Sequence, residues 1–204
     1  MRGVLTGGLP DTVEVEGEQI PIYTDWRVWI DVWRVVDNPN INQQKKAIAL
    51  LALVYPRTGE SPTPFDKALE HSEVAIEAAI LFLGRKRKGD EERPKTRREK
   101  RLAEKHLVDW DWDAERLVAD FEREYRIDLT HPDTSLHWWR FMALFSGLSD
   151  TSQIMEAIST RAQDLNDRKL SKDQKKALRE RKIAVMLPAR TQKEANENRR
   201  LRGH

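Results

Sequence analysis

The stretch "SLHWWRFMALFSGLS", residues 135–149, places two adjacent tryptophans, two phenylalanines, a methionine and three leucines in one segment of helical length. At about 100° per residue, most of these side chains gather on one arc, which predicts a core helix. The arc comprises Trp138, Phe141, Met142, Leu144, Phe145 and Leu148. Trp139 falls on the flank of this arc. We therefore expect it to be exposed and to contact a partner helix or a second copy of the chain.

Composition limits the classes of protein that the chain can form. Its 204 residues suit one domain or two small ones, and seven tryptophans argue against disorder. A charged fraction of 34% and a mean hydropathy of −0.73 are typical of a mostly helical protein with compact apolar stripes. The absence of cysteine excludes disulfides, thiolate metal sites and cysteine nucleophiles. The longest apolar run, residues 47–55, is far shorter than the ~18 residues of a membrane span, so a soluble cytoplasmic protein without a membrane partner is expected.

The N-terminal part alternates and then changes period. In "TVEVEGEQIPIY", residues 12–23, apolar and polar residues alternate on both sides of a glycine, which predicts a β-hairpin. "DWRVWIDVWRVV", residues 25–36, has helical spacing and begins at a candidate N-cap, Asp25. A second helix is expected over residues 42–55, and a third begins at Thr63. The expected buried face of the first helix is Trp26, Trp29, Ile30 and Trp33, and that of the third is Phe65, Leu69, Ile76, Ile80 and Leu83.

The C-terminal part predicts further helices. "VDWDWDAERLVADFEREYRIDL", residues 108–129, favours a helix with Asp113 as N-cap, Trp112 and Leu117 as a hydrophobic staple, and Phe121 and Tyr125 on its inner face. Ser171 is the candidate N-cap of the last helix, which Pro188 ends. The expected fold class is mainly α, a helical bundle in two halves with a small N-terminal β-hairpin. The expected parts are residues 1–24 with the hairpin, 25–84 as the N-terminal helical half, 85–105 as a charged linker, 106–187 as the C-terminal helical half and 188–204 as a basic polar tail.

Charge is unevenly distributed along the chain. Residues 85–101 hold ten basic and four acidic residues and no apolar one, and residues 168–204 hold thirteen basic and four acidic residues. Such segments can contact phosphates in a salt-dependent way, but a solvated run is the commoner outcome. Neither interleaves aromatic residues among its charges, as binders of single-stranded nucleic acid do. Nucleic-acid binding is therefore disfavoured as the main function.

A search for catalytic groups finds no converging set. His131 and His137 lie six residues apart without a further metal-ligand pattern, Gly7-Gly8 has no phosphate-loop sequence after it, and no serine sits in a nucleophile motif. Three aspartates in residues 109–113 could form an ion site, but aspartates at a helix start more commonly cap it. We expect no enzyme, no metal and no cofactor.

The chain resembles a known family over roughly residues 11–187. The residues that carry the resemblance are a Phe-x3-Tyr-x-Ile-Asp-Leu string over residues 121–129, a Leu-His-Trp-Trp-x-Phe string over residues 136–141 and an aromatic-acidic stretch before them. They are similar to the Gp-fifteen-type proteins of tailed bacteriophages and prophages. The resemblance implies a non-catalytic tail assembly chaperone that binds the tape measure protein, works in the host bacterial cytoplasm and is absent from the mature virion.

The resemblance also implies partners. They are the tape measure protein and the major tail tube protein, while the spare aromatic surface suggests self-association. The candidate partner-binding residues are Trp139, Trp138, Phe141, Trp112 and Tyr125. Two alternatives stay open: a structural component of the tail or head–tail junction, and a basic nucleic-acid-binding phage protein.

Overall fold

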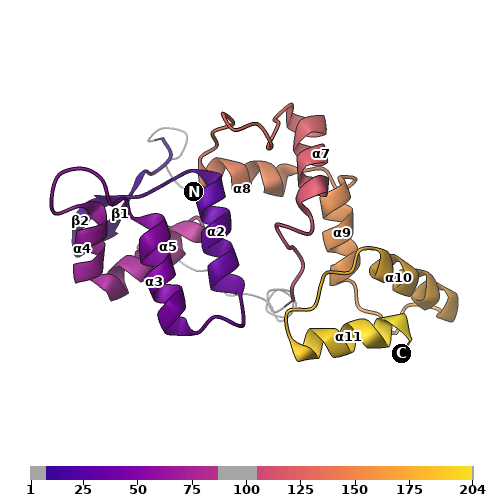
Figure 1. Ribbon diagram of the computed structural model, residues 1–204. Helices are drawn as coiled ribbons and strands as arrows, with labels where there is room; N and C mark the ends of the chain where they lie inside the picture. The colour runs from indigo at the N-terminus through magenta and orange to yellow at the C-terminus, as the bar shows by residue number, and fades with distance from the viewer. Residues whose placement is uncertain (1–7, 87–104, 204) are drawn as a thin grey trace. The chain divides into compact units, whose positions relative to one another are not determined.

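The computed structural model describes residues 8–86 and 105–203, and these are mainly α-helical with one small β-hairpin (Figure 1). The predicted fold class is confirmed. The strands are β1 (Thr12–Val15) and β2 (Glu18–Pro21); the helices are α2 (Trp26–Asp37), α3 (Gln43–Val54), α4 (Pro64–Glu70), α5 (Ser72–Leu83), α7 (Ala114–Tyr125), α8 (Trp138–Gly147), α9 (Gln153–Ala162), α10 (Lys172–Ala184) and α11 (Gln192–Arg202).

The elements group into two compact units. The N-terminal unit comprises residues 1–92 together with residues 135–146, and the C-terminal unit comprises residues 93–134 and 147–204. This differs from the predicted halves, because most of α8 groups with the N-terminal helices and not with residues 106–187. Most of the predicted charged linker, residues 87–104, lies outside the described residues.

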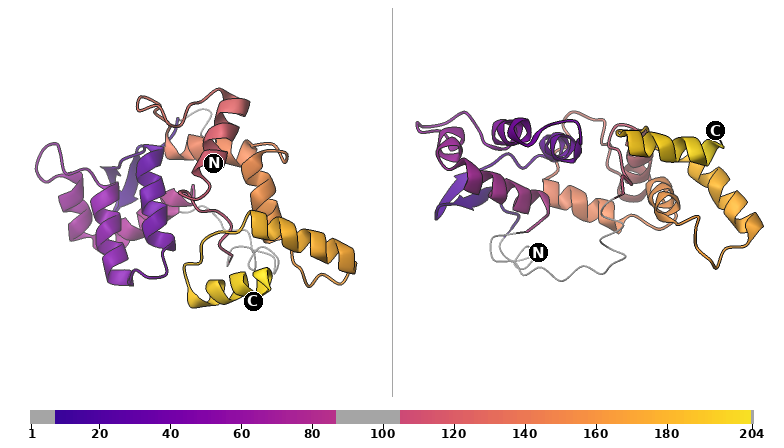
Figure 2. Two further views of the ribbon diagram at one scale, coloured as in Figure 1. Left: turned by 45° about the vertical axis from the view of Figure 1, so that its right-hand side comes forward. Right: turned by 90° about the horizontal axis from the view of Figure 1, so that it is seen from below.

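The predicted hairpin forms with antiparallel strands. Its turn residues Glu16 and Gly17 both have positive φ, 48° and 83°, as the tight turns of two-residue hairpins require. Ile22 N–H donates to Asp11 at 3.0 Å, so the adjacent Thr12–Pro21 pair is a non-bonded one, where the missing N–H of a proline costs no ladder bond. In Figure 2 the hairpin lies beside the helices of its unit, and β1 packs on α5.

Local capping sets the starts of α2, α3 and α4 as predicted. The Asp25 carboxylate accepts from Arg27 N–H at 2.9 Å, and the Asn42 side chain accepts from Lys45 N–H at 2.9 Å. Thr63 and Asp66 form a reciprocal capping box at the start of α4. On α2, Trp26, Trp29 and Ile30 are buried as expected, but Val32 completes the buried set and Trp33 is only half-buried.

The predicted buried stripe of the third helix is wrong. The segment breaks at His71 into α4 and α5, and Leu69 and Ile80 are 55% and 41% exposed. The core side is made of small residues and one phenylalanine: Ala68, Ala75, Ala78, Ala79 and Phe82. Small side chains allow α5 to pack closely against α3 and β1, and this close approach outweighs the burial of the larger residues.

The segment 135–149 forms the predicted core helix, α8. Its start pairs with the start of α2, because Trp26 N–H donates to Leu136 at 2.9 Å and Trp138 N–H donates to the Thr24 carbonyl at 2.7 Å. Aromatic rings then fill the space between α2, α5 and α8. The ring centroids are 4.9 Å apart for Trp26 and Phe141, 4.5 Å for Trp29 and Phe82, and 5.8 Å for Trp138 and Phe141.

The predicted basic tail is also wrong in part, because residues 192–202 form helix α11. Thr191 caps it by accepting from Glu194 N–H at 3.2 Å. Arg179 of α10 donates to the carbonyls of Leu201 and Arg200 at 2.6 and 2.7 Å, which satisfies the end of α11. Ser171 caps α10 as expected, with a full capping box.

Candidate partner-binding site

The structure buries three of the five predicted partner-binding residues. Trp138, Trp139 and Phe141 all belong to the core of the N-terminal unit, and Trp139 is only 1% exposed. The prediction that Trp139 lies on an exposed flank is therefore wrong. In the folded unit, Trp138 and Phe141 offer no surface to a partner, and Trp139 offers only the small part of its ring that lines the groove described below.

The end of α5 offers acceptors to the indole N–H groups of Trp138 and Trp139, and the Phe82 carbonyl also accepts from Arg85 N–H at 2.9 Å. A helix end leaves carbonyl groups without intrahelical donors, and burying them unpaired would be costly. Trp139 Nε1–H donates to the Phe82 carbonyl at 2.9 Å, and Trp138 Nε1–H donates to the Leu83 carbonyl at 3.0 Å. The adjacent tryptophans thus join the start of α8 to the end of α5 by two side-chain hydrogen bonds.

His137 has a structural position at the start of α8. Its Nδ1 accepts from Trp139 N–H at 3.0 Å, and its Nε2–H donates to the Pro10 carbonyl at 2.8 Å. Burial lowers the pKa of His137, an effect that hydrogen bonding to Pro10 and the charge of Asp11 partly oppose. Both ring nitrogens are engaged in the neutral form. Within residues 8–86 and 105–203 there is no group of three or more His, Asp or Glu side chains that could hold a metal ion.

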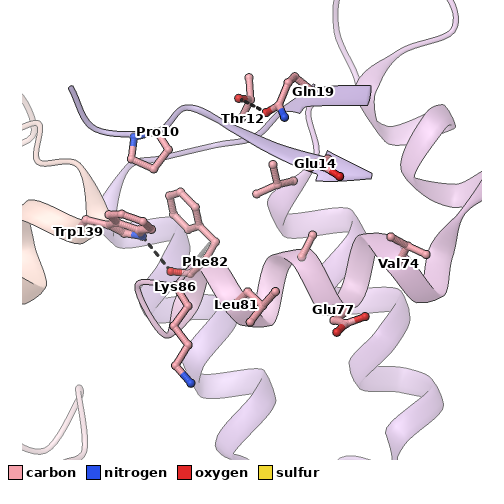
Figure 3. A pocket seen from close by; sticks show the side chains of 12 residues that line it. Pro10, Thr12, Glu14, Gln19, Val74, Glu77, Leu81, Phe82, Lys86 and Trp139 are labelled. Carbon is pink, nitrogen blue, oxygen red and sulfur yellow. Dashed lines mark hydrogen bonds between the residues drawn. The ribbon is translucent and has the colours of Figure 1, made fainter. Parts of the chain in front are cut away.

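A groove lies beside these tryptophans in the N-terminal unit, between β1 and α5. It encloses about 440 Å³ (Figure 3). Its apolar lining consists of Pro10, Val13, Val74, Ala78, Leu81, Phe82 and the ring of Trp139. Polar residues complete the lining, and in Figure 3 the side chains of Glu77 and Lys86 point away from the strand. An apolar floor with charged side chains at its border is suited to an apolar side chain of a partner.

Sequence reasoning missed this groove. The groove-lining residues of α5 lie on a different face from the stripe that the large aliphatic residues suggested. The signal that could have located the buried side is the alanine set Ala75, Ala78 and Ala79, because small residues at helical spacing indicate close packing.

The other two predicted residues belong to the C-terminal unit. Trp112 is 56% exposed and sits in a turn whose backbone is held by Asp109, since the Asp109 carboxylate accepts from the N–H groups of Asp111 and Trp112 at 3.0 and 2.9 Å. Tyr125 is half-buried, and its ring meets Phe121 edge-on at 5.6 Å. Trp112 is thus the one predicted residue of the five that is largely exposed.

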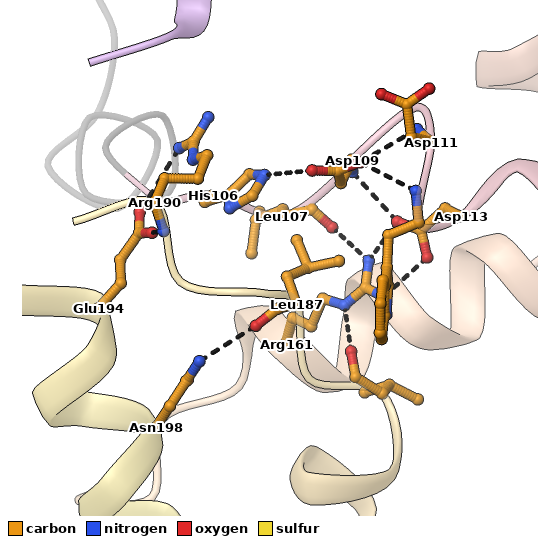
Figure 4. Close-up of polar contacts among 12 residues, drawn as sticks. His106, Leu107, Asp109, Asp111, Asp113, Arg161, Leu187, Arg190, Glu194 and Asn198 are labelled. Carbon is orange, nitrogen blue, oxygen red and sulfur yellow. Dashed lines mark hydrogen bonds and ion pairs between the residues drawn. The ribbon is translucent and has the colours of Figure 1, made fainter. Parts of the chain in front are cut away.

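The prediction that the side chain of Asp113 caps α7 is wrong. The Asp113 carboxylate caps no N–H of α7; it is fully buried and forms a bidentate pair with Arg161 at 2.7 and 2.8 Å (Figure 4). It also accepts from Arg116 at 3.0 Å and from Asp109 N–H at 3.1 Å. Two cations and one amide therefore satisfy this charge, which burial alone would make costly.

Arg161 forms hydrogen bonds with three different segments of the chain. Its guanidinium donates to the Leu107 carbonyl at 2.8 Å and to the Val185 carbonyl at 2.6 Å, in addition to Asp113. Asp120, two turns further along α7, accepts from the N–H groups of Gln153 and Ile154 at 3.1 and 2.8 Å. The two buried aspartates of α7 thus bind α9 at both of its ends, so this polar cluster holds the unit together.

The elements described here define a mainly α-helical protein with a small hairpin packed on helices α4 and α5. The chain matches the family model described as Bacteriophage Gp15 protein over residues 5–187, and it belongs to that family. The resemblance found in the sequence is confirmed. No curated protein and no solved structure matches the chain. Among the helices of the described residues, none has the length and apolar character needed to cross a membrane.

Proposed function

We propose that this protein is a non-catalytic tail assembly chaperone that binds the tape measure protein and assists assembly of the tail tube. Membership of a bacteriophage family supports the proposal. The observation that carries it is the groove between β1 and α5, which has an apolar floor and a polar border. As a chaperone of assembly, the protein would act in the host cytoplasm and would not remain in the finished particle. The major tail tube protein is a second partner that this role would bring to the same client.

The groove is large enough to take apolar side chains of a helical client. Its volume of about 440 Å³ falls within the ~300–1,000 Å³ range typical of binding sites. Amphipathic helices bind such grooves by inserting apolar anchors spaced three or four residues apart. An apolar client segment that is covered in this way is kept from aggregating until it is needed.

The groove is also preformed, which lowers the entropic cost of binding. Its floor, α5, is fixed at both ends. Near its start, the buried Tyr55 hydroxyl donates to the Ala75 carbonyl at 2.7 Å, and burial raises the pKa of Tyr55. At its end, Trp138 and Trp139 donate to the last carbonyls. The buried tryptophans therefore support the groove.

A co-purification experiment tests this proposal. The tagged protein is co-expressed with the tape measure protein of the same phage, and the soluble complex is quantified. Leu81→Glu places a charge in the groove and is expected to reduce the bound client about tenfold, since a charge in an apolar pocket is poorly solvated. Ile80→Glu makes the same change at the neighbouring, 41% exposed position outside the groove lining, and it should bind like the wild type.

Each outcome decides a separate point. A client that stays soluble and bound with wild type and Ile80→Glu, but not with Leu81→Glu, supports both the chaperone and the groove. Equal binding of the client by all three proteins would show that the client binds at a site other than the groove. If the client precipitates regardless and mass spectrometry finds this protein in purified virions, the alternative of a structural tail or head–tail component replaces the chaperone.

A further inference from the structure

Helix α7 has a second face that its packing in the C-terminal unit does not use. Its inner side buries Leu117, Asp120 and Phe121. Its other side forms a shallow hollow, which we call the α7 outer face. The hollow is lined by Ala114, Glu115, Val118, Ala119, Glu122, Arg123, Arg126 and Thr130. Glu115, Ala119, Glu122 and Arg126 are exposed and follow the three-four spacing of a helix–helix seam.

The N-terminal half of the α7 outer face is largely apolar and narrow, whereas its C-terminal half carries Glu122 and Arg123. Ala114, Val118 and Ala119 have short side chains, so a second helix could approach the backbone of α7 closely. Charges of opposite sign also lie toward the two ends of this face. Glu115 lies in the first turn of α7, and Arg126 is the residue that ends the helix. Within the described residues, neither of these two forms an ion pair.

Two copies of α7 in antiparallel orientation place opposite charges against each other. If two α7 helices lie antiparallel about a two-fold axis near residues 120–121, Glu115 of one copy faces Arg126 of the other, and the pair occurs twice. A parallel arrangement would instead place Glu115 against Glu115 and Arg126 against Arg126, which repel. An isologous contact of this kind requires no other partner.

We infer that the α7 outer face is a contact between two copies of this chain, formed by antiparallel α7 helices with Glu115–Arg126 pairs at both ends. The inference does not depend on the proposed chaperone function, because the groove belongs to the N-terminal unit and α7 belongs to the C-terminal unit.

The contact is expected to be weak. One twelve-residue helix from each copy buries less than the ~1,200 Å² of a stable interface. Dimers should therefore form at high protein concentration, or where several copies bind along one long client and raise the local concentration. A weak contact is well suited to a charge-exchange test, because small changes move the equilibrium measurably.

Sedimentation velocity of the full-length protein over a concentration series is the primary test. Glu115→Arg and Arg126→Glu should each weaken dimerisation about tenfold, since each creates two like-charge contacts. The combined variant Glu115→Arg/Arg126→Glu should restore it to within about threefold of wild type. Glu180→Arg, an equal change on the exposed side of α10, should have no effect. Circular dichroism of each variant confirms that the helices are intact.

A single introduced thiol gives an independent readout, because the chain has no cysteine. Ala119→Cys lies close to the inferred two-fold axis and should be joined into dimers by a short bismaleimide. Ala177→Cys, exposed on α10, should not. The inference is overturned if the wild type stays monomeric throughout, if the combined charge variant is no better than the single ones, or if both thiols cross-link equally.

Discussion

The two units of this protein are stabilised by different chemistry. The N-terminal unit is built on packed aromatic rings, with indole N–H groups that satisfy the carbonyls at the end of α5. The C-terminal unit is built on α7, whose buried aspartates bind α9 through Arg161 and through the first amides of that helix. The comparison shows that one short chain can hold its helices together either by packing apolar side chains or by pairing a few buried charges.

The difference has consequences for what each unit tolerates. An aromatic core loses stability in proportion to the volume removed, and the neighbouring rings relax only partly. A buried charge cluster loses stability when any one of its members is removed, because the remaining partner is then a buried charge without a counter-charge. The following predictions use this contrast.

The largest effect is expected for Trp138→Ala. This change removes a fully buried ring and leaves the Leu83 carbonyl without its donor, so the N-terminal unit should lose about 4 kcal/mol of unfolding free energy. Denaturant titration followed by tryptophan fluorescence measures this, because five of the seven tryptophans belong to that unit. Trp112→Ala, at an exposed position, should change stability by less than about 0.5 kcal/mol. Equal losses for the two variants would contradict the comparison.

A smaller loss is expected for Asp113→Ala. Arg161, only 7% exposed at its side chain, would keep its charge without a carboxylate, so the C-terminal unit should lose about 3 kcal/mol. Hydrogen exchange of α7 and α9 locates the loss, and amides of α2 should keep their protection. If Asp113→Ala loses no more stability than Trp112→Ala, the buried pair is not a main source of the stability of this unit.

The smallest effect is a pH dependence of the N-terminal unit through His137. Its folded pKa lies below the ordinary value of 6.5, so the unfolded chain takes up the proton more readily. Stability is therefore complete above about pH 6.5 and decreases as the pH falls from there toward the folded pKa. Unfolding midpoints measured at about pH 8 and about pH 5 test this.

His137→Asn is the matched control for the pH experiment. Asparagine keeps an acceptor for Trp139 N–H at the start of α8, but it does not titrate. The part of the pH dependence due to His137 should disappear in this variant. An unchanged slope would assign the effect to other groups.

The helix starts could be predicted from the sequence because capping is local. At each of these starts a capping side chain accepts from an amide two or three residues further along the chain, so the local sequence suffices to locate the start of the helix. The caps are Asp25, Asn42, Thr63 and Ser171. The hairpin was predictable for the same reason, since its turn and its alternation lie within a few residues. The strings Phe-x3-Tyr-x-Ile-Asp-Leu and Leu-His-Trp-Trp-x-Phe also placed the chain in its family.

The candidate site could not be predicted in the same way. The groove depends on which face of α5 meets β1 and α3, and helical spacing alone allowed both the aliphatic and the alanine face. Helical spacing alone predicts Trp139 at the surface, because its own helix offers it no place on the core arc. The carbonyl that accepts its N–H belongs to Phe82, 57 residues away in the chain.

By itself, the sequence determined the helical class, the hairpin, the starts of the helices that Asp25, Asn42, Thr63 and Ser171 cap, and the core character of residues 135–149. The tertiary structure alone decided that most of α8 joins the N-terminal unit, that Asp113 pairs with Arg161 and does not cap its own helix, and that residues 192–202 form a helix. The physical reason is the separation along the sequence of the residues that interact. Caps and turns are set by contacts within a few residues, whereas the burial of a ring or a charge depends on partners that only folding brings close.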